Sequence, residues 1–99
     1  MRVLFVVGRL QENETIFRLA ERMAEDGCRV SFLFIGEGCR HSADTRLMRA
    51  LNLAGGVYVL RGDCLSLGLL NDLAEGVEAV DYGGWVDLLE ACDRVVSWN

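Results

Sequence analysis

The sequence has no proline, no lysine and no long hydrophobic run. Because 52% of its 99 residues are hydrophobic, it does not have the composition of a disordered chain. Apolar runs such as residues 3–7 and 32–35 are far shorter than the roughly 20 residues that span a bilayer. Met1-Arg2 leads directly into the first run, without the longer apolar core of a signal peptide. We therefore expect one cytoplasmic domain over residues 1–99, without a membrane segment.

The four cysteines form no Cys-x-x-Cys pair, which removes a common metal-binding and redox motif. They stand at positions 28, 39, 64 and 92, and a disulfide framework is not expected in a reducing compartment. Cys39 and His41 could supply two ligands to a zinc ion, but the sequence offers no obvious source of the other two. We expect neither a metal nor a cofactor.

Charge is distributed unevenly along the chain. Residues 1–61 carry nine arginines and seven acidic residues, a net charge of +2, whereas residues 62–99 carry one arginine and eight acidic residues, a net charge of −7. The acidic part is either ordinary solvated surface or a surface for a basic partner. No broad basic patch is present, so tight, direct nucleic-acid binding is not expected.

Short apolar runs alternate with segments of helical periodicity. Continuous apolar runs are typical of strands buried on both faces, and each is followed by apolar residues at helical spacing. This alternation predicts an α/β fold with three layers, in which helices cover both faces of a five-stranded parallel sheet. We expect a flavodoxin-like domain with strand order 2-1-3-4-5. The predicted strands are residues 3–7, 30–35, 57–60, 77–80 and 95–98, and the predicted helices begin near Asn13, Ser42, Asp63 or Cys64, and Asp81.

Chemistry in such folds gathers at the carboxyl ends of the strands. The segments that follow the first four strands there are residues 8–11, 36–41, 61–66 and 81–84. They contain Cys39, His41 and Cys64, whereas Cys28 and Cys92 fall away from this edge.

Cys64 is the first candidate for chemistry, because it lies where a strand turns into a short helix. Backbone N–H groups and the helix dipole favour a thiolate at such a position, and Arg61 would add to this effect while Asp63 would oppose it. On this interpretation Cys64 is partly exposed and carries sulfane sulfur as a persulfide. The alternative is a buried cysteine that packs as a small hydrophobic residue.

Cys39 is the second candidate. Arg40 and a protonated His41 would both favour its thiolate, but it could equally be an ordinary loop cysteine. His41 itself is either a surface residue or a base.

Other functions find less support in the sequence. Gly36-Glu-Gly38 is half of a dinucleotide fingerprint, but it follows the second predicted strand and lacks the third glycine. No phosphate-binding loop of the Walker type occurs. A phosphoacceptor receiver domain is disfavoured because Gly8-Arg9 stands where an acidic pair is needed and no lysine is present.

Two aromatic residues near the fourth predicted helix have two interpretations. Trp85 and Tyr82 can pack against the core, or they can anchor a partner, since aromatic residues are enriched in binding hot spots.

Residues 57–99 resemble the DsrE/DsrF/DsrH-like sulfur-relay family, and most of all its DsrH/TusB branch. The resemblance rests on Val57-Tyr-Val-Leu60, on Asp63-Cys-Leu-Ser-Leu-Gly-Leu69, on Asp81-Tyr-Gly-Gly-Trp-Val-Asp-Leu88 and on Val95-Val-Ser-Trp98. It implies a flavodoxin-like fold and assembly with DsrE/DsrF-like or TusC/TusD-like subunits into an oligomer. It also implies transfer of persulfide sulfur between a donor and an acceptor protein, in tRNA wobble-uridine thiolation or in sulfur oxidation.

Some residues depart from the family pattern. Ser66-Leu67-Gly68 replaces an Ala-Arg-Gly segment, and the first predicted helix has no cysteine where DsrH-type subunits carry one. Cys64 lies near the sulfur-carrying cysteine of the DsrE/TusD branch, while TusB-type subunits often lack an active cysteine. Three hypotheses follow: a sulfur carrier that uses Cys64 or Cys39, a non-catalytic subunit of a sulfur-relay complex, and a small-molecule-binding flavodoxin-like domain unrelated to sulfur.

Overall fold

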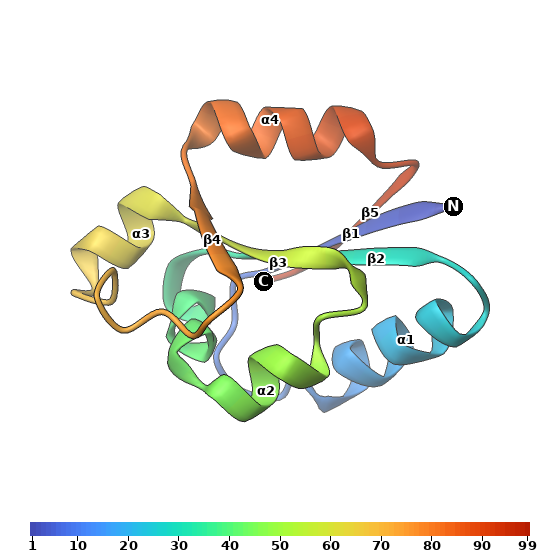
Figure 1. Ribbon diagram of the computed structural model, residues 1–99, viewed down its shortest axis with the longest axis horizontal. Helices are drawn as coiled ribbons and strands as arrows, with labels where there is room; N and C mark the ends of the chain where they lie inside the picture. The colour runs from blue at the N-terminus through green and yellow to red at the C-terminus, as the bar shows by residue number, and fades with distance from the viewer.

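The computed structural model describes residues 1–99 and confirms the predicted α/β fold with a five-stranded parallel sheet (Figure 1). The predicted alternation of strands and helices is present, with one additional 3₁₀ helix, η1. No helix combines the length and the apolar character that a membrane crossing requires. The elements are β1 (Arg2–Val7), α1 (Glu14–Glu25), β2 (Arg29–Phe34), η1 (Gly36–Ala43), α2 (Thr45–Ala50), β3 (Ala54–Leu60), α3 (Arg61–Ser66), β4 (Val77–Val80), α4 (Tyr82–Ala91) and β5 (Arg94–Trp98).

The strand order is β4-β3-β2-β1-β5, so the predicted order 2-1-3-4-5 is wrong. The pairs β1–β2 and β3–β4 were expected, but β2 also pairs with β3 and β1 pairs with β5. The physical reason is burial: four of the six residues of β2 are buried and this strand lies inside the sheet, whereas β4 has four residues, none of them fully buried and one an exposed glutamate, and lies at an edge. Edge positions suit short strands that carry charged residues.

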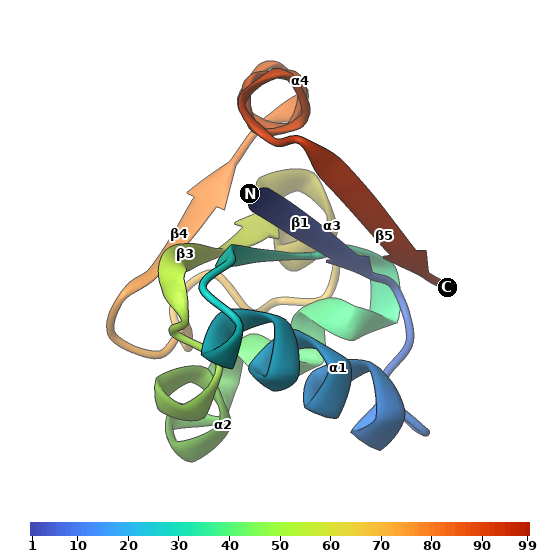
Figure 2. The same ribbon diagram turned by 90° about the vertical axis from the view of Figure 1, so that its right-hand side faces the viewer.

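This order decides which face each helix covers. The connections from β1 to β4 all step in one direction across the sheet, and right-handed crossovers therefore place α1, η1 and α2 on one face. The connection from β4 to β5 runs back across the sheet, which places α4 alone on the other face (Figure 2).

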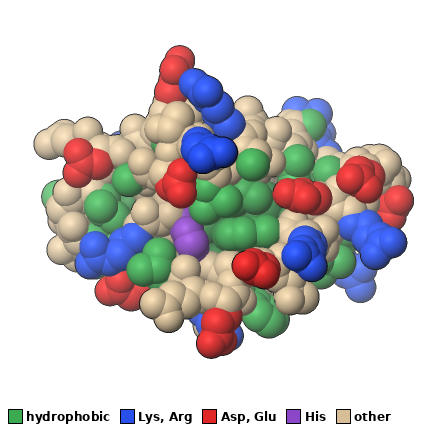
Figure 3. All heavy atoms as spheres, turned by 90° about the horizontal axis from the view of Figure 1, so that it is seen from below, with side chains coloured by type: hydrophobic (Ala, Val, Ile, Leu, Met, Phe, Trp, Pro, Cys, Tyr) green, Lys and Arg blue, Asp and Glu red, His purple; other side chains and the backbone are tan.

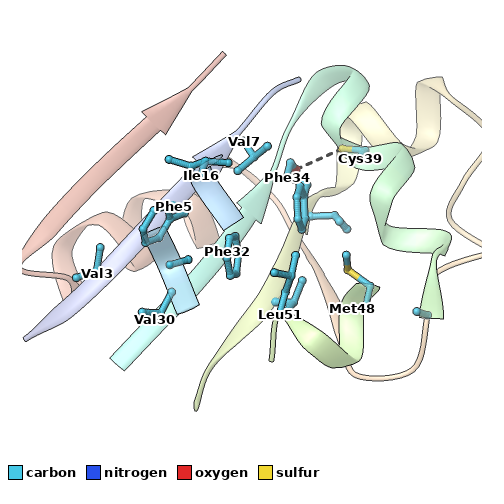
Figure 4. Packing of buried hydrophobic residues seen from close by; sticks show 14 of the residues in the cluster. Val3, Phe5, Val7, Ile16, Val30, Phe32, Phe34, Cys39, Met48 and Leu51 are labelled. Carbon is cyan, nitrogen blue, oxygen red and sulfur yellow. Dashed lines mark hydrogen bonds between the residues drawn. The ribbon is translucent and has the colours of Figure 1, made fainter. Parts of the chain in front are cut away.

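The two faces of the sheet carry cores of different size. On the α1 and α2 face, alternate strand residues such as Phe5, Phe32 and Phe34 pack with Ile16 and Met48 (Figure 4). On the α4 face, a smaller core forms around Leu4, Val6 and Leu33 and receives side chains from α4. The central strands are thus buried on both sides, as their continuous apolar sequences predict.

Candidate functional site

Three segments meet at the carboxyl ends of the central strands: the turn after β1, η1 and α3. The Gly38 N–H donates to the Gly8 carbonyl at 3.2 Å, which joins η1 to the first turn. The Gly36 N–H donates to the Asp63 carboxylate at 2.6 Å, which joins η1 to α3. A Cβ atom on Gly38 would overlap the carbonyl oxygen of Val7, so only glycine allows η1 to lie this close to β1.

Cys39 and Cys64 come together at this edge. Both side chains are 0% exposed, and both belong to the larger core. The Cys39 thiol donates to the Phe34 carbonyl at 3.3 Å (Figure 4). Each of the two thiols affects the pKa of the other, and the Ser42 hydroxyl affects that of Cys64, so the three side chains lie close together. The topology therefore places two thiols that are 25 positions apart in the sequence beside each other.

The surroundings of this pair favour the neutral thiols. Burial raises the pKa of Cys39 far above its ordinary value, and the Cys64 thiol and the Asp63 carboxylate act in the same direction. Burial also raises the pKa of Cys64, while its contacts with Cys39 and Ser42 act in the opposite direction. An uncharged thiol avoids the cost of burying a charge without a counterion.

The expected partial exposure and lowered pKa of Cys64 are therefore wrong. Cys64 is the fourth residue of a helix of only six residues, and its side chain points into the core rather than to solvent. A helix this short supplies little dipole, and Arg61 is exposed and forms no ion pair with a carboxylate. The charged group that acts on Cys64 is Asp63, which opposes the thiolate.

The basic neighbours of Cys39 do not stabilise its thiolate either. The Arg40 guanidinium pairs with Glu37 at 2.6 Å, and both side chains are largely exposed. His41 does not act on the pKa of either thiol. It contacts the aromatic rings of Phe17 and Phe34 at centroid distances of 5.7 and 5.5 Å.

His41 connects η1 to the start of α1 as a neutral hydrogen-bond acceptor. The Asn13 amide nitrogen lies 2.8 Å from His41 Nε2 and 2.7 Å from the Arg9 carbonyl. Because the Arg9 carbonyl can only accept, the Asn13 atom at this position is the donating nitrogen, and Nε2 must accept. Burial lowers the pKa of His41, which agrees with this assignment. Figure 3 shows the histidine at the margin of a group of hydrophobic side chains on the α1 and α2 face.

Sequence reasoning missed the roles of Ser42 and Asn13. Ser42 was expected to cap the second helix, but Asp44 caps α2 by accepting from the Leu47 N–H at 3.1 Å. The Ser42 hydroxyl instead donates to the Cys39 carbonyl inside the core. Asn13 occupies the N-cap position of α1 as expected, yet its side chain makes no capping bond because it holds His41 and Arg9. No local sequence signal distinguishes these hydrogen bonds of Ser42 and Asn13 from helix capping.

Tyr82 and Trp85 lie at the start of α4, stacked at a ring-centroid distance of 6.1 Å. Trp85 packs against the smaller core, whereas Tyr82 is 69% exposed. Tyr82, Val86 and Leu89 are spaced by four and three residues and form an exposed apolar stripe along α4. Contact of Tyr82 and Trp85 with a partner stays a prediction.

The described residues contain no group of three or more histidine, cysteine or acidic side chains that could hold a metal ion.

Comparison with known proteins agrees with this architecture. A sequence model of the DsrH-like family, described as "DsrH like protein", matches residues 11–95. The chain belongs to the DsrH-like family. Among solved structures, this DsrH-like chain is similar to the crystal structure of the ychN protein from E. coli, with a TM-score of 0.82, 12% sequence identity and coverage of 99% of both chains. At that identity the likeness shows the fold alone. No curated protein matches the sequence.

Proposed function

We propose that this chain is a subunit of a cytoplasmic sulfur-relay complex, in which persulfide sulfur passes between proteins. The support is membership in the DsrH-like family, whose members are components of multi-subunit sulfur-relay complexes. The relay would serve tRNA wobble-uridine thiolation or sulfur oxidation, as the resemblance of residues 57–99 implies.

Within such a complex, the geometry favours a subunit that shapes the assembly over one that carries sulfur. The observation behind this preference is the burial of the two thiols at the carboxyl edge, Cys39 and Cys64, which are 0% exposed and have raised pKa values. Attack on a persulfide needs a thiolate that the donor can reach. The apolar stripe of Tyr82, Val86 and Leu89 is the surface we propose for contact with a related subunit, with the rings of Tyr82 and Trp85 at its end.

A carrier role is the second candidate, because Cys64 and Cys39 lie side by side. After local opening of α3, the Cys64 thiolate would attack the outer sulfur of a donor persulfide, forming Cys64–S–SH and releasing the donor as a thiol. The adjacent Cys39 would then be within reach of the bound sulfur, and Asp63 is the charged group that acts on both thiols.

One experiment separates the two roles. The purified protein is incubated with a cysteine desulfurase and cysteine, and its intact mass is recorded beside those of Cys64→Ser, Cys39→Ser and the control Cys28→Ser. The shaping role predicts no gain of one sulfur atom by any of the four proteins. A gain that Cys64→Ser or Cys39→Ser abolishes, but Cys28→Ser retains, would establish a carrier and its site.

The subunit assignment has its own test. The chain is co-expressed with DsrE-type and DsrF-type subunits, and the mass of the complex is measured by light scattering. We expect a complex that Val86→Asp weakens and Asp87→Asn leaves intact. If the chain neither associates with such subunits nor gains sulfur, the proposed function is wrong.

A further inference from the structure

A pocket of about 260 Å³ lies under the C-terminal half of α4, at the amino ends of the strands. It is therefore at the opposite edge of the sheet from Cys39 and Cys64. Its walls come from β1, β2, β3 and α4, and it belongs to the face that only α4 covers (Figure 2).

An irregularity in β3 shapes one wall of the pocket. Val30 pairs with Ala54 and Phe32 pairs with Val57, so β3 contains one residue more than β2 across this interval. This extra residue is a bulge, and Ala54 adopts a φ of 73°, which is uncommon for a residue with a side chain. Bulges and such backbone strain are over-represented beside functional sites.

At the bulge, the pocket wall is formed by Gly55, which has no side chain. A Cβ atom on Gly55 would overlap the Val30 carbonyl and the Ser31 hydroxyl. The Ser31 hydroxyl donates to the Gly55 carbonyl at 2.9 Å and so holds the bulge in place. Beyond it, the Tyr58 ring lies over Gly56 and lines the pocket.

Two arginines stand side by side at the pocket. Arg2 and Arg29 are register partners on neighbouring parallel strands, so their side chains emerge on the same face of the sheet. Neither guanidinium takes part in the two salt bridges of the chain, which join Arg9 to Glu12 and Arg40 to Glu37. Two like charges side by side repel each other. The carboxylate bonded at this place, Asp93, accepts from the Arg2 backbone N–H at 2.7 Å and forms no salt bridge with either guanidinium.

We propose that this pocket binds a small organic oxyanion, a carboxylate or phosphate ester that carries one ring or a short alkyl group. The oxyanion lies between the guanidinium groups of Arg2 and Arg29, which match carboxylate and phosphate oxygens with paired N–H donors. The apolar part lies against Tyr58 and Leu88. A cavity of about 150 Å³ holds benzene, so the larger volume here leaves room for a ring and its anionic group.

The first test measures affinity with four probes: benzoate, phenyl phosphate, neutral benzamide and inorganic phosphate. Isothermal titration calorimetry is done on the wild type, Arg2→Gln, Arg29→Gln and the control Arg46→Gln, which removes an exposed arginine of α2 outside the pocket. We expect benzoate or phenyl phosphate to bind the wild type and Arg46→Gln equally. Loss of one charged hydrogen-bond partner should weaken binding about tenfold in Arg2→Gln and in Arg29→Gln.

The probes also separate the sources of binding. Whichever of benzoate and phenyl phosphate binds more tightly identifies the oxyanion. Benzamide should bind at least about tenfold more weakly, because it lacks the charge. Inorganic phosphate that binds as tightly as phenyl phosphate would show that the apolar wall contributes nothing, and would overturn the assignment to an organic anion.

The second test locates the ligand through a natural thiol. Cys92 is half-buried and lines the pocket, whereas Cys28 is half-buried and packs against the core on the other face. We expect the better probe to slow the alkylation of Cys92 by N-ethylmaleimide several-fold, measured on peptides by mass spectrometry, and to leave Cys28 unchanged. The proposal is wrong if neither anion binds at millimolar concentration, if all arginine variants bind alike, or if Cys92 is not protected.

Discussion

Alkaline pH should destabilise this protein through its two buried thiols. Cys39 and Cys64 have pKa values raised by burial in the folded state, while the ordinary value for an exposed thiol is 9.0. The folded state therefore holds more protons than the unfolded state as the pH rises above 9. It follows that the stabilisation is fully present below pH 9 and is lost progressively above it.

The magnitude follows from proton counting. Between pH 8 and pH 10, an unfolded thiol with a pKa of 9.0 passes from about one tenth to about nine tenths ionised, which lowers the free energy of unfolding by about 1.4 kcal/mol. If both folded thiols stay protonated, the two together lower it by about 2.7 kcal/mol. The chain has no lysine and arginine does not titrate in this range, so few other groups obscure the effect.

The assay is urea denaturation at pH 8, 9 and 10 in the presence of a phosphine reductant. We expect the wild type to lose up to about 2.7 kcal/mol over this interval, and Cys39→Ser and Cys64→Ser each to lose about half as much. The readout is the change with pH, so a lower overall stability of these variants does not affect it. A control variant, Cys28→Ser/Cys92→Ser, removes the half-buried thiols and should behave as the wild type. A Cys39→Ser/Cys64→Ser protein with the same pH dependence as the wild type would refute the reasoning.

Three further predictions concern single residues. Gly38→Ala should lower the free energy of unfolding by about 1–3 kcal/mol, because the added Cβ overlaps Val7. The control Gly62→Ala, whose added Cβ meets nothing within 4 Å, should not lower it. Equal urea midpoints for Gly38→Ala and the wild type would contradict this prediction. Asp81→Ala should cost about 1 kcal/mol in thermal or urea unfolding, since its carboxylate accepts from the Gly84 N–H at 2.8 Å. Burial lowers the pKa of His41 in the folded protein from 6.5, so stability should fall as the pH drops below about 6.5, and His41→Gln should reduce that fall. Urea midpoints at pH 7 and 5.5 measure the effect. A His41→Gln protein with the same pH dependence as the wild type would exclude a role for His41.

Much of the fold could be predicted because its signals are local. The continuous apolar runs mark strands that are buried on both faces, and Asp81 caps α4 as its place before that helix suggests. The leucines that follow Cys64 recur at helical spacing and predict a helix that reaches Leu73, but α3 ends at Ser66, and Leu70 and Leu73 pack against the core from irregular backbone. Apolar spacing alone does not distinguish a helix from a loop whose leucines happen to reach the core.

Only the location of the candidate site, at the carboxyl ends of the strands, could be predicted from the sequence. The chain order puts residues 36–41 and 61–66 at the same edge of any parallel sheet, and the Gly36–Asp63 hydrogen bond shows that they meet. The state of the thiols could not be predicted, because burial depends on how closely η1 packs on β1 and α3 on η1. Likewise, Arg40 was assigned to Cys39 by its position, whereas in three dimensions Glu37 is its partner.

By itself, the sequence determined the class of fold, the position of most elements and the family, because hydrophobic periodicity and short motifs act over a few residues. Only the tertiary structure decided the strand order, the helix-poor face covered by α4 and the pairing of Arg2 with Arg29. It also decided that Cys39 and Cys64 are neighbours and closed to water. These features arise from contacts between residues far apart in the chain, and such contacts depend on how all the strands compete for the centre of the sheet.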